Sequence, residues 1–160
     1  MKPFAAVIFP LGLLLFGVPG HAQSPPSDPN LRITIRDAIQ QARSLRKSQE
    51  AISSALEAKQ ASREILTEQI AIAEKTMQSL QGSIDKIDAQ YDSLSEARQS
   101  AVRDAWSTLK LFGVLFEFLK ETAVKPDSPE REKDLISHAK STTRRAVQLD
   151  ETLSLLNRPT

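Results

Sequence analysis

The chain contains no cysteine, which excludes disulfides, thiol catalysis and thiolate metal centres. Histidine is also scarce, since only His21 and His138 occur. We expect His138 to be a solvated helix residue, because pairing it with Asp134 four residues earlier gives only a single-imidazole metal site. A glycine-rich phosphate loop, an HExxH motif and a nucleophile-elbow serine are missing as well. These absences predict a non-catalytic protein with no metal, no cofactor and no small-molecule substrate.

Neither sign of charge dominates the sequence. The chain has 21 basic and 20 acidic residues, and Lys2 is the only charged residue among the first 22, so 20 of each sign follow it. Basic and acidic residues are interleaved without a basic stripe, which excludes nucleic acid as a partner. The same neutrality gives no general attraction to an anionic membrane surface.

Glycine and proline are almost missing from the middle of the chain. Residues 31–125 contain no proline and only two glycines, Gly82 and Gly113. Alanine, leucine, glutamine and charged residues fill this stretch, and these residue types favour long α-helices. We therefore predict an all-α fold.

Residues 1–22 have the pattern of a secretory signal peptide. Lys2 supplies the positive start, an uncharged apolar stretch covers 4–18, and small residues stand at Gly20 and Ala22. The apolar stretch is shorter than the about 20 residues that span a bilayer. We expect cleavage before Gln23 and Sec-dependent export to the periplasm or the cell exterior. The exported protein is expected to be soluble, and not a lipoprotein because it has no cysteine to carry a lipid.

A proline-rich leader follows and then the first predicted helix. Residues 23–33 are polar and rich in proline at their start, and we predict them to be disordered. Residues 34–37 read Thr-Ile-Arg-Asp, which resembles a capping box and predicts that a helix begins there. Residues 30–42 also resemble the opening of outer-membrane efflux channel proteins, but this is a common helix-start pattern with no repeat later in the chain. We assign the chain to no family on this ground.

The helical segments carry the heptad pattern of a coiled coil. Apolar residues recur at alternating steps of four and three from Leu66 to Leu94, which is an a/d seam. Extended toward the N-terminus, the register weakens at Gln49, Lys59 and Arg63, where polar residues occupy seam positions.

The sequence predicts a further helix at the C-terminal end. It begins at Pro129 behind the N-cap Ser128 and ends near Asn157. The short link over 125–129 lets it fold back antiparallel onto the preceding helix.

Two topologies follow from the two roles that Gly82 can take. If the chain bends at Gly82, or at the polar pair Asp92 and Ser93, a three-helix bundle results. If it does not bend, one helix of about 130 Å runs from 35 to 123 and requires oligomerisation. We favour the bent form: an elongated antiparallel helical hairpin or three-helix bundle with coiled-coil heptads. It forms a single domain, 34–157, with helices over 35–81, 83–124 and 129–157.

Residues 105–119 form an unusually apolar segment with only two charges, Lys110 and Glu117. On a helix its apolar side chains cover nearly the whole circumference, with Leu111, Val114 and Phe118 on a third face. The segment is either the core of the bundle, a docking surface for a protein, or a membrane-penetrating helix. The candidate interaction residues are Trp106, Leu109, Phe112, Phe116 and Phe118.

These observations predict an exported, non-catalytic coiled-coil interaction protein such as an adaptor, a scaffold or a chaperone-like clamp. Its partner is another protein, or a second copy bound through the coiled-coil seam. The alternative is a membrane-active helical protein that uses the 105–119 segment, although membrane contact is the less favoured reading.

Overall fold

The computed structural model describes residues 28–158, and every regular element in that range is helical. The elements are α1 (Pro29–Glu57), α2 (Arg63–Asp88), α3 (Glu96–Ala123) and α4 (Pro129–Ser154), with short 3₁₀ helices η1 (Tyr91–Ser93) and η2 (Leu155–Asn157). The predicted all-α class is confirmed for this part of the chain. The predicted signal peptide, 1–22, lies outside the described residues.

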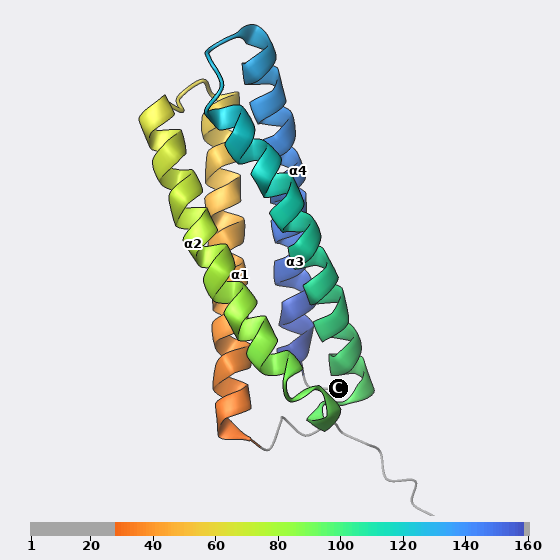
Figure 1. The fold of residues 1–160 in the computed structure, drawn as a ribbon. Coiled ribbons are helices and arrows are strands. Elements are labelled where there is room, and N and C mark those ends of the chain that lie inside the picture. The colour runs from red at the N-terminus through yellow and green to blue at the C-terminus, as the bar shows by residue number, and fades with distance from the viewer. Residues whose placement is uncertain (1–27, 159–160) are drawn as a thin grey trace, which may run out of the picture.

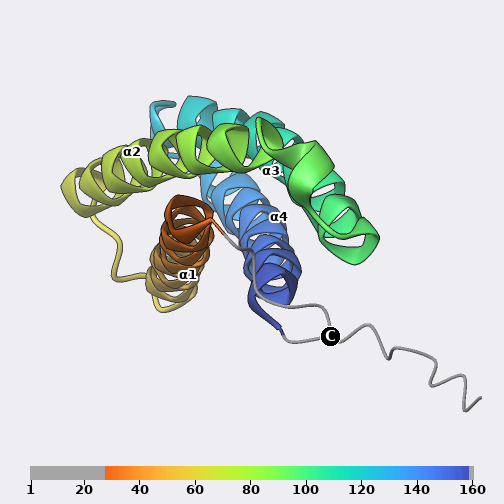
Figure 2. The ribbon, with the colours of Figure 1, turned by 90° about the horizontal axis from the view of Figure 1, so that it is seen from below.

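The four long helices alternate in direction and pack as an up-down-up-down bundle (Figure 1). Each helix packs on two others: α1 on α2 and α4, and α3 on α2 and α4. Viewed from the end, α2 and α3 lie on one side of the bundle and α1 and α4 on the other (Figure 2). The short connections place every pair of consecutive helices antiparallel, as bundles with brief loops require.

The first helix begins earlier than the sequence predicted. Asp28 is its N-cap and accepts a 2.8 Å hydrogen bond from the backbone N–H of Asn30, with Pro29 at the first helical position. Thr34 lies inside the helix, where its hydroxyl donates to the carbonyl of Asn30. The predicted helix start at the 34–37 capping box is therefore wrong, and the predicted disordered leader is wrong over 29–33. An aspartate before a proline is a stronger helix start than the Thr34 pattern.

Gly82 is not a turn, and the predicted three-helix arrangement is wrong. It lies within α2 in helical conformation and is exposed. The chain turns instead at 58–62, where α1 ends and Lys59 adopts a positive φ of 56°. Of the seam positions that weakened the heptad pattern, Lys59 lies within this turn and Arg63 is the first residue of α2 after it.

The second turn is the one predicted as the alternative to Gly82. Residues 89–95 connect α2 to α3 through η1, which contains Asp92 and Ser93. Ser95 then caps α3 by accepting from the backbone N–H of Arg98. The predicted start of the last helix is confirmed, since Ser128 caps α4 ahead of Pro129 and accepts from the backbone N–H of Arg131 at 3.0 Å.

The predicted seam faces the bundle interior. Most of its members between Leu66 and Leu94 are buried, and Met77 and Tyr91 are partly buried against them. The apolar residues Leu135, Ala139, Ala146, Leu149 and Leu153 of α4 are buried as well. The largest fully buried side chains include two aromatic residues of α3 and the aliphatic residues that surround them: Phe112, Phe116, Leu45, Leu80, Ile84, Ile87, Leu119, Leu149 and Leu153.

Candidate functional site on helix α3

The apolar segment 105–119 lies within α3, and the bundle divides it into buried and exposed faces. Leu109, Phe112 and Phe116 are only 3%, 0% and 0% exposed, and the two phenylalanine rings stack with centroids 5.5 Å apart. Three of the five predicted interaction residues are therefore core residues in this fold. A partner cannot contact them without opening the bundle, because α2 and α4 both pack over α3.

The other two predicted residues reach the surface on different sides of α3. Trp106 is half-buried and borders α2, and the Lys110 ammonium lies 4.6 Å from the centre of its ring. Phe118 is 47% exposed and borders α4, where its ring stacks on His138 with centroids 6.0 Å apart. The five predicted residues thus do not form one surface.

One row of exposed apolar side chains does exist on α3, and we call it the α3 stripe. It consists of Leu111, Val114 and Phe118, which are 39%, 55% and 47% exposed. Steps of three and four residues place them on one helical face over two turns. The sequence grouped these three residues, but it did not identify Leu111 and Val114 as surface residues.

A groove runs beside the stripe, between α2 and α3. Its volume is about 410 Å³, and Val114 belongs both to the groove wall and to the stripe. Met77 and Gln81 line it from α2, and Trp106, Gly113 and Glu117 line it from α3. The α3 stripe therefore borders a shallow, mostly apolar depression.

Lys120 joins α2 and α3 close to this groove. Its ammonium donates hydrogen bonds to Glu74 of α2 and, at 3.1 Å, to Glu117 of its own helix. These two hydrogen bonds raise the pKa of Lys120 above its ordinary value, the bond to Glu74 contributing most. The Lys120–Glu74 ion pair holds α3 against α2 at a point close to the α3 stripe.

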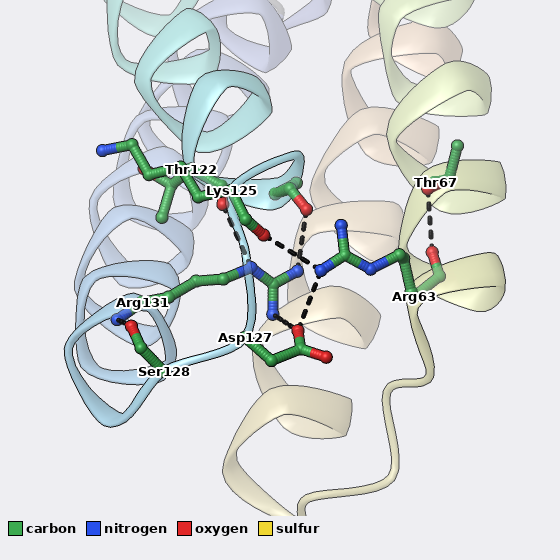
Figure 3. Close-up of polar contacts among 8 residues, drawn as sticks. Arg63, Thr67, Thr122, Lys125, Asp127, Ser128 and Arg131 are labelled. Atoms are coloured by element: carbon green, nitrogen blue, oxygen red, sulfur yellow. Dashed lines mark hydrogen bonds and ion pairs between the residues drawn. The ribbon is translucent and has the colours of Figure 1, made fainter.

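The end of the bundle where α3 meets α4 carries a cluster of two arginines on one carboxylate (Figure 3). Arg63 and Arg131 each donate to Asp127 at 2.9 Å. Arg131 also donates to the carbonyls of Thr122 and Ala123, at 3.2 and 2.7 Å, at the C-terminal end of α3. Both guanidinium groups are thus used to cap α3 and to join its loop to α2, which is a structural role.

A second arginine cluster lies near the other end of the bundle. Arg36, Arg43 and Arg158 line an open groove of about 600 Å³ between α1 and η2. Arg43 lies 3.6 Å from Asp150, which also accepts a hydrogen bond from Arg46 at 3.3 Å. The pKa of Arg46 is raised, mainly by its hydrogen bond to Glu50 and then by Asp150.

One polar pair is buried in the interface of α1 and α4. Gln49 is fully buried, and its side-chain carbonyl accepts a 2.7 Å hydrogen bond from the hydroxyl of Thr142. The amide nitrogen of Gln49 has no hydrogen-bond partner among the described residues. A buried polar group without a hydrogen-bond partner lowers the free energy of unfolding.

Among residues 28–158, no helix is both long and apolar enough to cross a membrane. The described part of the chain also has no group of three or more histidine, aspartate or glutamate side chains placed to share a metal ion. No known family, curated protein or solved structure matches this chain.

Proposed function

We propose that this chain is an exported, non-catalytic interaction protein that binds another polypeptide through the α3 stripe. The observation that supports this most directly is the exposure of Leu111, Val114 and Phe118 on one face of a helix whose other apolar residues are largely buried. A partner that covers these side chains gains their burial free energy without opening the bundle.

The grouping of these residues distinguishes them from the other exposed apolar side chains. Single exposed hydrophobic residues are common on protein surfaces and need no explanation. Ile65 and Ile72 lie two turns apart on α2, and Ile33 and Val124 lie at or near the ends of different helices. Within residues 28–158, only the α3 stripe combines three such residues on consecutive turns and includes an aromatic ring, the kind of side chain that dominates binding energy at interfaces.

The stripe is also held rigidly in place. α3 packs against both α2 and α4, and Phe118 is supported by the ring of His138. Lys120 ties α3 to Glu74 of α2. A surface on such a support loses little conformational entropy when a partner binds, which favours affinity.

The remaining parts of the proposal concern export and packing. Residues 1–22 act as a signal peptide that is removed on export, and the absence of cysteine suits an oxidising compartment. The heptad seams of the helices pack as an antiparallel coiled coil around the shared core. The bundle then serves as a scaffold that presents α3 outside the cytoplasm.

A photoreactive amino acid at position 114 tests the interaction in the exporting cell. We expect illumination to join the protein to a polypeptide partner and give one adduct of defined mass. The matched control places the same amino acid at Ser79, an exposed residue of α2 away from the stripe, where no adduct is expected. The absence of an adduct at position 114, or equal adducts at both positions, would overturn the proposal.

A further inference from the structure

We infer that the partner of the α3 stripe is a second copy of this chain. Its α3 packs antiparallel to the first, about a two-fold axis that passes between Val114 and Leu115. This inference rests on the proposed function and identifies the polypeptide that the stripe binds. It is carried by the self-complementary order of apolar and charged side chains along α3.

The apolar residues match under this symmetry. In an antiparallel pair with the axis at this point, Leu111 of each copy faces Phe118 of the other. Val114 lies next to the axis, where the small side chain lets the two helices approach closely. The α3 stripe of each chain is thereby covered by the α3 helix of the other chain.

The charged residues beside the stripe match as well. Lys110, Glu117 and Glu121 project on the same side of α3, within about 40° of one another at 100° per residue. Antiparallel pairing brings Lys110 of one copy to within about 3 Å, along the helix axis, of both Glu117 and Glu121 of the other. The two-fold axis repeats this contact, so each interface contains it twice.

The parallel arrangement lacks these contacts. A two-fold axis along the helices would place the charged side chains of the two copies on opposite edges of the interface, so Lys110 would not meet Glu117 or Glu121 of the second copy. Opposite charges across a helix pair select partner and orientation. The order of charges therefore favours the antiparallel dimer.

These groups are available for contacts between copies. Glu121 is exposed and makes no ion pair within residues 28–158. Lys110 is exposed and lies over the ring of Trp106, which leaves its ammonium free to meet a carboxylate. The Glu117 side chain is 56% exposed although it accepts from Lys120. None of the three has to leave a buried ion pair on association.

Reciprocal charge variants test the antiparallel geometry of the dimer. The protein is purified in the form that the cell produces after any processing. Size-exclusion chromatography with light scattering should give a dimer for the unmodified protein. K110E should bring three carboxylates together at each contact between copies, and E117K/E121K should bring three ammonium groups together there. Each variant should raise the dimer dissociation constant about tenfold or more, since two attractive contacts become repulsive.

Mixing the two variants should restore the dimer. The carboxylate introduced by K110E in one copy then faces the two ammonium groups introduced by E117K/E121K in the other, so opposite charges meet again. Circular dichroism and thermal unfolding must show that each variant remains folded, and V114E serves as a second disruption of the interface at its apolar centre. The inference is overturned if the unmodified protein is a monomer, or if the mixture of folded variants stays monomeric.

The absence of cysteine allows a direct test of the axis. Val114→Cys should form a disulfide between copies under mild oxidation, because equivalent residues beside a two-fold axis come close enough for this bond. Ser79→Cys is the matched control and should stay reduced. A monomeric Val114→Cys protein after oxidation would count against the dimer.

Failure of this inference is distinguishable from failure of the proposed function. If the photoreactive residue at position 114 gives an adduct with a different polypeptide while the purified protein is monomeric, the α3 stripe binds another protein and the dimer is wrong. If it gives no adduct at all, both proposals fail.

Discussion

Lys59 occupies a backbone conformation that glycine adopts at much lower cost. Its φ of 56° is the one positive value among non-glycine residues in the described chain. The N–H groups of Lys59 and Gln60 donate to the carbonyls of Leu56 and Ala55, at 3.2 and 2.9 Å. This is the Schellman pattern that ends many helices, and glycine usually fills the left-handed position. A lysine here explains why the sequence did not reveal the turn.

Replacing this lysine should therefore stabilise the protein. Lys59→Gly removes the steric cost of the left-handed conformation and should raise the free energy of unfolding by about 1 kcal/mol. Urea denaturation measures the change. Lys59→Ala is the control, since it removes the same side chain and its exposed 3.8 Å ion pair with Glu132 but keeps the Cβ atom. An equal gain in both variants would show that the backbone conformation is not the cause.

Gln49 carries a different cost, because its buried amide nitrogen lacks a partner among the described residues. Gln49→Met keeps the shape of the side chain and removes this group, so the free energy of unfolding should stay unchanged or rise by about 1 kcal/mol. The single hydroxyl hydrogen of Thr142 can then turn to the carbonyl of His138 or of Ala139, at 3.1 and 3.0 Å.

The companion variant is Thr142→Val, which leaves both polar atoms of Gln49 unpaired and should cost about 1–3 kcal/mol. In the double variant most of that loss should be recovered. A double-mutant cycle by urea denaturation gives these values. A large loss for Gln49→Met alone would mean that the amide nitrogen is satisfied in solution.

At the scale of the element, the continuity of α2 through Gly82 has a measurable consequence. A Cβ atom added at Gly82 meets nothing within 4 Å, and the residue lies in the helix interior. Gly82→Ala should raise the free energy of unfolding by about 1 kcal/mol, the difference in helix propensity between the two residues. Thermal unfolding monitored by circular dichroism is a suitable measurement. A loss of stability would indicate that the chain bends at Gly82.

The stability that the Lys120 ion pair with Glu74 contributes between α2 and α3 should depend on pH. Because the folded protein raises the pKa of Lys120, the stabilisation is present below the ordinary lysine pKa of 10.5 and is lost as the pH rises through the higher folded value. Lys120→Met should therefore be less stable than the unmodified protein at neutral pH, by less than about 1 kcal/mol because the pair is partly exposed.

The difference between the two proteins should shrink once the pH passes 10.5. Urea midpoints measured across this range provide the test. Lys75→Met is the control, since Lys75 of α2 makes no ion pair with another described residue. A difference that is independent of pH would assign the effect of Lys120→Met to packing.

At the scale of the whole molecule, the cluster in Figure 3 joins the α3–α4 connection to the start of α2. Arg131 is nearly buried and caps two carbonyls of α3, whereas the Asp127 side chain is 81% exposed. Arg131→Met should lower the free energy of unfolding by about 1–3 kcal/mol, because it leaves charged hydrogen bonds unmade.

Asp127→Asn should cost less than about 1 kcal/mol, because exposed ion pairs contribute little. Chemical denaturation compares the two variants. Equal losses would show that the ion pairs, and not the capping of α3, hold this end of the bundle together.

The predictions from sequence succeeded where they rested on local rules. Ser128 before Pro129 identified the start of α4, and the heptad seams identified the residues that are buried. The predictions failed where a rare residue type, glycine, was taken to mark a turn. Gly82 attracted the predicted turn because glycine is scarce, while Lys59 makes the actual turn. For the candidate site, the sequence located the apolar segment, but only the structure shows that Leu109, Phe112 and Phe116 are buried while Phe118 is exposed.

The sequence by itself determined the helical class, the start of α4 and the core seams, because propensity, capping and the 3.6-residue period act within a few residues of one another. Only the tertiary structure decided that the described chain forms four long helices and that Leu111, Val114 and Phe118 remain exposed. The physical reason is that α3 is apolar on three faces. Which face stays in contact with solvent depends on where α2 and α4 pack, and residues far away in the chain set those positions.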